Sequence, residues 1–376
     1  MDVRAILLLG PGADAAAPPT PEGVPLPLLD VLGRPLLARV ADQLKAFGVT
    51  HRAAVADVGP SAARFVTPAL RQNLTWLPAP GAALWRTAQD VFSKFAHNGA
   101  DLVLVLRLST YYELDYERII QFHLDRNARV TAATDCAGAM LGAFVISASR
   151  RNDAAFLLRH SLLRSRTPLV LYPFAGYSHR LTALADLRQL AVDAFCGRSQ
   201  IAPQGEEIKP GIWVAPGARI HRAARVLSPA FIGRYARVRA GAVITRCTAL
   251  ERHTEVGRGT VVEDTTVLPY TKLGTALDVA HAVVGFGKVA SLRRGVEVEI
   301  GDSKLVGSVL SAPLRVWQQM LSLLAYLPLE FARGLLGRPA APETPGFPLV
   351  VSAPARALST TDSLPATTDR AVSNFQ

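Results

Sequence analysis

Three observations predict that this chain folds as an α/β domain followed by a parallel β-helix. Over residues 1–200, short apolar runs alternate with segments of helical periodicity, which is typical of a largely parallel sheet covered by helices. Between Val214 and Leu268, an aliphatic residue recurs at every sixth position. Beyond Pro313, an apolar segment with helical spacing leads into a tail rich in Pro, Ala, Ser and Thr.

The elements of the first 200 residues can be placed from their apolar patterns. Buried strands are expected where short runs are wholly apolar, and helices where apolar residues recur three and four positions apart. The expected strands are Ala5–Leu9, Arg52–Val58, Leu102–Leu106, Val130–Thr134, Gly142–Ser147 and Leu169–Phe174. The expected helices are Pro35–Phe47, Leu84–Ala96, Tyr116–Asn127, Asp153–Leu163 and Leu184–Phe195.

A six-residue repeat dominates the second half of the chain. A 3.6-residue helix cannot keep one face through such a repeat, and a plain strand has a period of two. Hexapeptides are the unit of parallel β-helices, in which three make one turn with each aliphatic pointing inward. The stripe resembles the left-handed hexapeptide-repeat proteins, slips near Gly274 and continues irregularly to about Val309. Its ten members are Val214, Ile220, Val226, Ile232, Val238, Ile244, Leu250, Val256, Val262 and Leu268.

These patterns divide the chain into four parts and a linker. We expect an α/β domain at residues 1–200, a linker at 198–211, a β-helix at 205–310, an amphipathic helical segment at 313–336 and a disordered tail at 337–376. The amphipathic segment has two interpretations. It either caps the open end of the β-helix or lies in a membrane interface with Trp317 and Tyr326 as anchors.

Charge and cysteine content limit the partners and the cellular location that we expect. The formal net charge is +11 with a pI near 10, which favours anionic partners such as acidic polysaccharide or a membrane surface; an arginine-rich proteome would give the same balance. The three cysteines lie far apart and form neither a disulfide framework nor a zinc motif. The start of the sequence predicts a buried strand rather than a secretion signal. We therefore expect a cytoplasmic protein, either free or peripheral to the inner face of the membrane.

Four segments of the first 200 residues carry a family resemblance. They are PLPLLDVLGRPLLARVADQLKAFGV from Pro25, LVLVLRLSTYYELDYERIIQFHLDRNARVT from Leu102, GAFVIS from Gly142 and GYSHRLTALADL from Gly176. In the same order they resemble segments of the sugar-nucleotide pyrophosphorylases, which are sugar-1-phosphate nucleotidyltransferases with a C-terminal β-helix. The resemblance implies a Rossmann-like nucleotidyltransferase domain that binds a nucleotide or sugar nucleotide, with Mg²⁺ in active members.

The charged residues that this chemistry uses are replaced here. A sugar 1-phosphate attacks the α-phosphate of a nucleoside triphosphate, so the protein must offset concentrated negative charge. The family's triphosphate loop keeps Gly10 and Gly12, but it has no arginine. The family's loop-proximal lysine falls on Leu26, and its two metal-binding aspartates fall on Arg107 and Arg180.

A further segment of the family, which carries a sugar-phosphate lysine, is reduced here to Ala132–Leu141. We therefore expect a catalytically degenerate protein that acts as a binding, regulatory or scaffold subunit, with no catalytic residue and no cofactor. Mg²⁺ is expected only under the alternative, an active pyrophosphorylase in which arginine replaces the metal charge. The expected ligand-binding residues lie where parallel strands end: Gly10, Gly12, Gly81, Arg107 and Arg180.

The β-helix offers a third interpretation, because hexapeptide proteins include acyltransferases that use a histidine base. His221, His253 and His281 are the candidates, and His281 is preferred because it lies where the repeat slips. The seven arginines between Val214 and Leu250 predict a basic girdle over more than one face, with Arg219 stacked over Arg237. Since no aromatic platform accompanies them, specific nucleic-acid binding is not expected. We expect a homo-oligomer.

Overall fold

The computed structural model describes residues 1–10, 23–56, 60–79, 83–148 and 169–309. All of these belong to one compact unit. The expected helix at Asp153–Leu163, the amphipathic segment 313–336 and the tail 337–376 lie outside the described residues. The part of the chain up to residue 200 is called the α/β region below, and residues 206–309 are called the strand-rich region.

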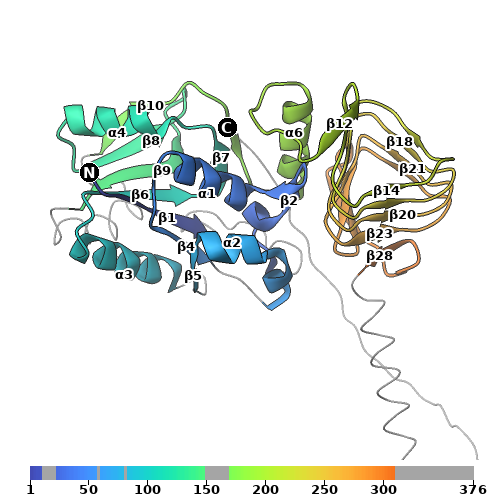
Figure 1. Cartoon of the computed structure of the whole chain (residues 1–376), viewed down its shortest axis with the longest axis horizontal. Coiled ribbons are helices and arrows are strands. Elements are labelled where there is room, and N and C mark those ends of the chain that lie inside the picture. Colours follow the sequence, from blue (N-terminus) through green and yellow to red (C-terminus); the bar gives the residue numbers. More distant parts are fainter. Residues whose placement is uncertain (11–22, 57–59, 80–82, 149–168, 310–376) are drawn as a thin grey trace, which may run out of the picture. The chain divides into compact units, whose positions relative to one another are not determined.

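The α/β region is built on a large sheet that is mostly parallel (Figure 1). Among the described residues it has seven strands in the order β10-β8-β9-β6-β1-β4-β5, and β9 is its antiparallel member. The largely parallel sheet expected from the sequence is confirmed. The strands are β1 (Val3–Leu9), β4 (Arg52–Ala56), β5 (Thr75–Pro78), β6 (Leu102–Arg107), β8 (Val130–Thr134), β9 (Met140–Ser147) and β10 (Val170–Pro173).

Helices cover both faces of this sheet because its strands are apolar on both sides. In β1, Leu7 and Leu9 face one core cluster while Ile6 and Leu8 face another, as the alternation of strand side chains requires. The first cluster includes residues of α1, α4 and α6, and the second includes residues of α3. The helices are α1 (Leu36–Ala46), α2 (Pro68–Asn73), α3 (Leu84–His97), α4 (Tyr116–Asp125) and α6 (Leu184–Phe195), with 3-10 turns η2 (Leu26–Leu28) and η3 (Pro60–Phe65).

Two small ribbons complete the α/β region. The hairpin β2 (Asp30–Val31) and β3 (Arg34–Pro35) turns through Leu32 and Gly33, which both have positive φ. The second ribbon joins β7 (Thr110–Tyr112) to β11 (Ser178–Arg180) in antiparallel pairing. None of the described helices is both long and apolar enough to cross a membrane.

Among the described residues, the strand-rich region consists of many short strands in three sheets (Figure 1). The first sheet holds β12 (Glu206–Lys209), β13 (Ile212–Val214), β16 (Ala230–Ile232), β19 (Thr248–Leu250), β22 (Thr266–Val267), β25 (Ala282–Gly285), β26 (Lys288–Ser291) and β27 (Val296–Glu299). The second holds β14 (Arg219–Ile220), β17 (Arg237–Val238), β20 (Glu255–Val256), β23 (Thr271–Leu273) and β28 (Val306–Ser308). The third holds β15 (Arg225–Val226), β18 (Val243–Thr245), β21 (Val261–Glu263) and β24 (Asp278–Ala280).

The chain returns to each sheet after 18 residues at first, as three six-residue segments require. Ile220 pairs with Val238, and Val226 pairs with Ile244. The stripe residues from Ile232 to Val262 are buried in one shared cluster. The expectation that these aliphatics point inward is therefore confirmed for that stretch.

The repeat slips earlier than expected, and the tenth stripe residue was assigned wrongly. Leu250 pairs with Val267, a separation of 17, and Val267 rather than Leu268 joins the inner cluster. Leu268 is buried instead in the cluster shared with the α/β region. The shortened corner contains Asp264 with φ of 45°, whereas the corresponding full-length corner contains both Arg246 and Cys247 at positive φ. One residue fewer in the corner therefore shifts the later stripe by one position.

The expected linker at 198–211 also needs correction. Its second half forms β12, which pairs antiparallel with β13 and extends the first sheet. The opposite end of that sheet turns back on itself through β26 and β27 in antiparallel pairing. The hexapeptide pattern does not predict these strands, because strands that pair antiparallel at the ends of the sheet do not follow the six-residue spacing.

Candidate functional site

The carboxyl edge of the parallel strands is the first candidate site. β1 lies between β4 and β6, so the chain leaves β1 toward one side of the sheet and later returns to its other side. Open α/β sheets bind ligands at such a switch point. Gly10 follows β1 directly, and Arg107 ends β6 opposite Leu8. The structure thus brings Gly10 and Arg107 to the same edge.

Arg107 is held in place by its neighbours. Its guanidinium lies over the ring of Trp85, 5.5 Å from the ring centroid, in a favourable cation–π geometry. Gly142 of β9 packs against it closely enough that an added Cβ would lie 3.0 Å from the Arg107 Cβ. A positioned cation therefore stands where the resemblance expects a carboxylate ligand of Mg²⁺, and its charge repels a divalent metal.

The other predicted residues separate into three groups. Arg180 is exposed on β11 and pairs with Thr110, three residues beyond Arg107 in the chain. Leu26 is buried in the core at the start of η2, so its side chain supports packing. Gly12 and Gly81 lie outside the described residues.

Carboxylates near this edge are used for structure. Asp186 accepts hydrogen bonds from the backbone amides of Thr182 and Ala183 and from the Thr182 hydroxyl. Burial raises the pKa of Asp186, but hydrogen bonds from His179 and from those groups outweigh it and lower the value to about 2. Asp186 therefore fixes the start of α6. Within the described residues, no group of three or more His, Cys, Asp or Glu side chains could hold a metal ion.

A buried polar cluster that the sequence did not suggest joins the two regions. The carboxylate of Glu251, fully buried, accepts hydrogen bonds from the amides of Leu32 and Gly33, both at 2.8 Å. Asp30, in the same hairpin and also fully buried, lies 3.3 Å from the guanidinium of Arg252. A signal existed in the sequence, because Glu251 is the first acid after seven arginines and follows an inward leucine.

Burial dominates the proton affinity of this cluster. It raises the pKa of Glu251, and the charge of Asp30 raises it further against the two amide hydrogen bonds and Arg39. It also raises the pKa of Asp30, against the opposing charges of Arg252 and Arg39. Two carboxylates in one desolvated site resist being ionised together.

A second connection runs from α6 into the strand-rich region. Arg188, whose side chain is almost completely buried, donates to the carbonyl of Cys247 and pairs with the carboxylate of Asp264. The other oxygen of Asp264 lies 2.6 Å from Nδ1 of His281. The structure therefore orients His281, the preferred acyltransferase candidate, through a carboxylate.

The other two candidate histidines, His253 and His221, have different surroundings. His253 is stacked between Tyr235 and Tyr270, with ring centroids 5.1 Å apart on each side. Burial lowers the pKa of His253, and the nearby charges of Arg252, Arg234 and Arg237 lower it further. His253 is thus part of an aromatic column with Tyr235 and Tyr270. His221 is exposed and lines the groove described next.

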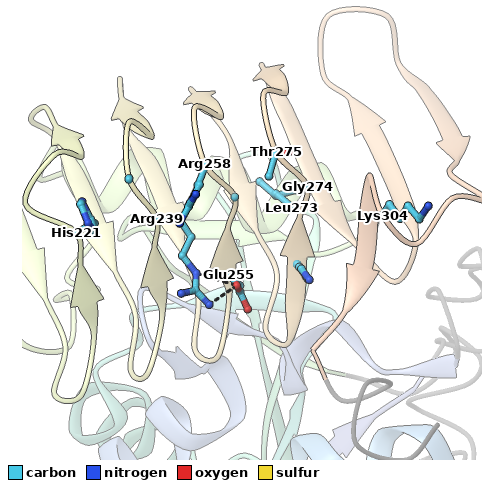
Figure 2. Close-up of a pocket in the computed structure, with 11 residues that line it drawn as sticks. His221, Arg239, Glu255, Arg258, Leu273, Gly274, Thr275 and Lys304 are labelled. Atoms are coloured by element: carbon cyan, nitrogen blue, oxygen red, sulfur yellow. Dashed lines mark hydrogen bonds and ion pairs between the residues drawn. The ribbon is translucent and has the colours of Figure 1, made fainter. Parts of the chain in front are cut away.

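The second candidate site is a groove of about 540 Å³ along the second sheet of the strand-rich region. Figure 2 shows its side chains on successive turns of the chain, with Arg239 and Glu255 joined across adjacent strands. Its lining contains Arg239, Arg258, Lys272 and Lys304 as cations, His221, and Glu255 as its acid. The volume falls in the range of ligand-binding clefts.

The arginines expected to form a basic girdle lie on or beside more than one sheet. Arg219 pairs with Arg237 on the second sheet, as expected. Arg225 and Arg246 lie on or beside the third sheet, and Arg246 is paired with Glu263. The first sheet shares a core cluster with the α/β region.

No protein-family model matches this chain, and a search of curated proteins finds no similar sequence. The function therefore has to be inferred from these two sites.

Proposed function

We propose that this chain is a nucleotidyltransferase-like protein of sugar-nucleotide or surface-polysaccharide metabolism that binds its ligand without turning it over. In this proposal the α/β region is a Rossmann-like nucleotidyltransferase domain at 1–200, and the strand-rich region is a left-handed β-helix at 205–310. The protein is cytoplasmic or peripheral to the inner face of the membrane, and it works as a homo-oligomeric binding, regulatory or scaffold subunit.

The observation that carries the proposal is Arg107 at the switch point of the sheet. A guanidinium fixed over Trp85 can pair with a phosphate group by bidentate hydrogen bonds. It cannot hold the Mg²⁺ that phosphoryl-transfer chemistry uses to neutralise charge. The site therefore supports binding of a phosphorylated ligand, and it lacks the feature that would make the α-phosphate reactive.

The 17- and 18-residue returns to three sheets support the β-helix part of the proposal. So does the inner cluster, which is made of aliphatic residues from all three sheets. A structural platform of this kind has no chemistry of its own.

A thermal-shift series on the full-length protein tests the proposal. Nucleoside triphosphates, sugar 1-phosphates and nucleotide sugars are added one at a time, with and without Mg²⁺, and pyrophosphate is measured in parallel. We expect one class to raise Tm by a few degrees, with no pyrophosphate release. Arg107→Ala should abolish the shift. Arg126→Ala is the matched control, because Arg126 also lies over an aromatic ring, at 5.1 Å from Phe122, but sits at the end of α4.

Pyrophosphate release at ordinary turnover would contradict the proposal and favour the alternative of an active pyrophosphorylase. A shift that persists in Arg107→Ala would also contradict it.

A second candidate function rests on His281. An imidazole held by a carboxylate is the arrangement of a general base, and His281 lies 2.6 Å from Asp264. Acetyl transfer from a coenzyme A donor to a hydroxyl or amine acceptor would favour a hexapeptide acyltransferase, and its loss in His281→Ala would assign the base.

A further inference from the structure

The outward residues of the second sheet form a surface that we call the basic face. It comprises Arg219, His221, Arg237, Arg239, Glu255, Arg258, Lys272 and Lys304. The strand pairing sets Arg219 beside Arg237, Arg237 beside Glu255, and Glu255 beside Lys272. These four residues therefore form one column that crosses four successive strands.

Most of this positive charge is uncompensated. Glu255 is neutralised by Arg239, whose Nε and Nη2 donate to it at 3.0 and 2.7 Å. Within the part of the chain that the structure describes, no carboxylate forms an ion pair with Arg219, Arg237 or Lys272. Like charges directly opposite each other on neighbouring strands are destabilising, so placing Arg219 beside Arg237 does not help the protein to fold.

The spacing of the cations distinguishes between kinds of anion. Neighbouring strands lie about 4.8 Å apart. Each of the four successive turns carries an exposed cation, namely Arg219, Arg237, Arg258 and Lys272, although Glu255 holds the third place in the column itself. A single phosphate would need several donors converging on one point. Here the cations are spread over successive turns, from Arg219 to Lys272, with Lys304 beyond (Figure 2). The arrangement fits a linear anion lying across the strands.

Two glycines line the groove beside this column. Gly257 and Gly274 occupy the positions after the inward Val256 and Leu273. A Cβ on Gly257 would lie 2.0 Å from the carbonyl oxygen of Gly274, and one on Gly274 would lie 2.3 Å from that of Lys304. Close backbone approach between successive turns therefore requires glycine at both positions, and both glycines line the groove together with Arg258 and Lys272.

We propose that the basic face binds a linear acidic polysaccharide, a chain with one carboxylate on each sugar unit, laid along the column from Arg219 to Lys272. Successive carboxylates of an extended chain repeat at about the length of one sugar ring, which is close to the strand spacing. Guanidinium groups pair with carboxylates by bidentate hydrogen bonds. This inference concerns the strand-rich region and does not depend on the function proposed for the α/β region.

Other polyanions fit the basic face less well. Single-stranded nucleic acid is bound by stacking of bases on aromatic side chains. No Phe, Tyr or Trp lines the groove, and Tyr235, which lines a second pocket with Arg237 and Glu255, already packs on His253. A membrane surface is bound with apolar side chains inserted beside the cations, and the exposed residues of the column are charged.

The test measures binding of full-length protein to oligogalacturonate at low salt. Neutral oligomaltose, anionic phosphatidylserine vesicles and oligo-dT serve as comparison ligands. The variant Arg237→Ala/Arg258→Ala/Lys272→Ala removes three exposed cations from the basic face. The control Arg118→Ala/Arg225→Ala/Arg246→Ala removes three exposed cations elsewhere. Both lose the same charge, and thermal melting checks that both remain folded.

We expect salt-sensitive binding of oligogalacturonate and none of oligomaltose. The basic-face variant should weaken binding by about tenfold or more, since each exposed pair contributes a factor of roughly two to five. The control should change it less than about twofold. Absence of oligogalacturonate binding, equal losses in the two variants, or tighter binding of vesicles or oligo-dT would each overturn the proposal.

Discussion

Charged side chains of the α/β region and of the basic face differ in the partners that they have within the chain. In the α/β region, Asp115 and Asp186 are used to begin α4 and α6, and Arg4 is paired with Asp2. On the basic face, Arg219 lies beside Arg237, and Glu255 separates Arg237 from Lys272. None of these three cations forms an ion pair with another described residue. Charged side chains with partners inside the chain stabilise the fold. Exposed cations that have no ion pair among the described residues favour an anionic partner outside the chain.

The largest effect on stability is expected where the two regions meet. Arg188→Ala removes a buried guanidinium and leaves Asp264 and the Cys247 carbonyl without it, so we expect a loss of about 2 to 4 kcal/mol in the free energy of unfolding. Chemical denaturation measures it. Arg246→Ala is the matched control, since it breaks an exposed pair with Glu263 at 2.5 Å and should cost less than about 1 kcal/mol. Equal effects of the two variants would remove the distinction between buried and exposed pairs.

An intermediate effect is expected from the pH dependence of the cluster around Glu251. Burial raises the pKa of Glu251 to about 8 and that of Asp30 to about 6, above their unfolded values. The folded state therefore binds protons more tightly than the unfolded state. The resulting stability is present in full below the unfolded values and is lost as pH rises through the folded ones. We expect the free energy of unfolding to fall by about 1 to 3 kcal/mol between about pH 5 and pH 8.

Asp30→Asn should flatten this slope, because it removes one titrating group and the charge that raises the pKa of Glu251. Asp278→Asn, an exposed change on the third sheet, should leave the slope as it is. A slope of opposite sign over this interval would show that the cluster is ionised in the folded protein.

The smallest effect is expected on the basic face itself. Arg219 lies directly beside Arg237, and like charges in that position repel. Arg219→Ala should therefore leave the free energy of unfolding unchanged or raise it by up to about 0.5 kcal/mol at low salt, and the gain should vanish at high salt. Urea denaturation at two ionic strengths measures it. A clear loss of stability would assign Arg219 a structural role and weaken the contrast between the regions.

The sequence predicted regular elements best where local pattern and burial agree. Val130–Thr134 and Leu184–Phe195 were predicted with the bounds that the structure has. Prediction failed where a change in corner length broke the six-residue spacing. Leu268 kept the six-residue spacing, but a corner shortened by one residue turned it toward the α/β region and placed Val267 inside.

The candidate sites follow the same division. Composition and periodicity alone determined the order of the two regions and the inward aliphatic stripe, because these depend on residue type and spacing. Only the tertiary structure decided that Arg107 and Gly10 lie at the same edge of the sheet and that Glu251 accepts hydrogen bonds from the hairpin amides. Each of these depends on which segments distant in sequence come together, and no local pattern carries that information.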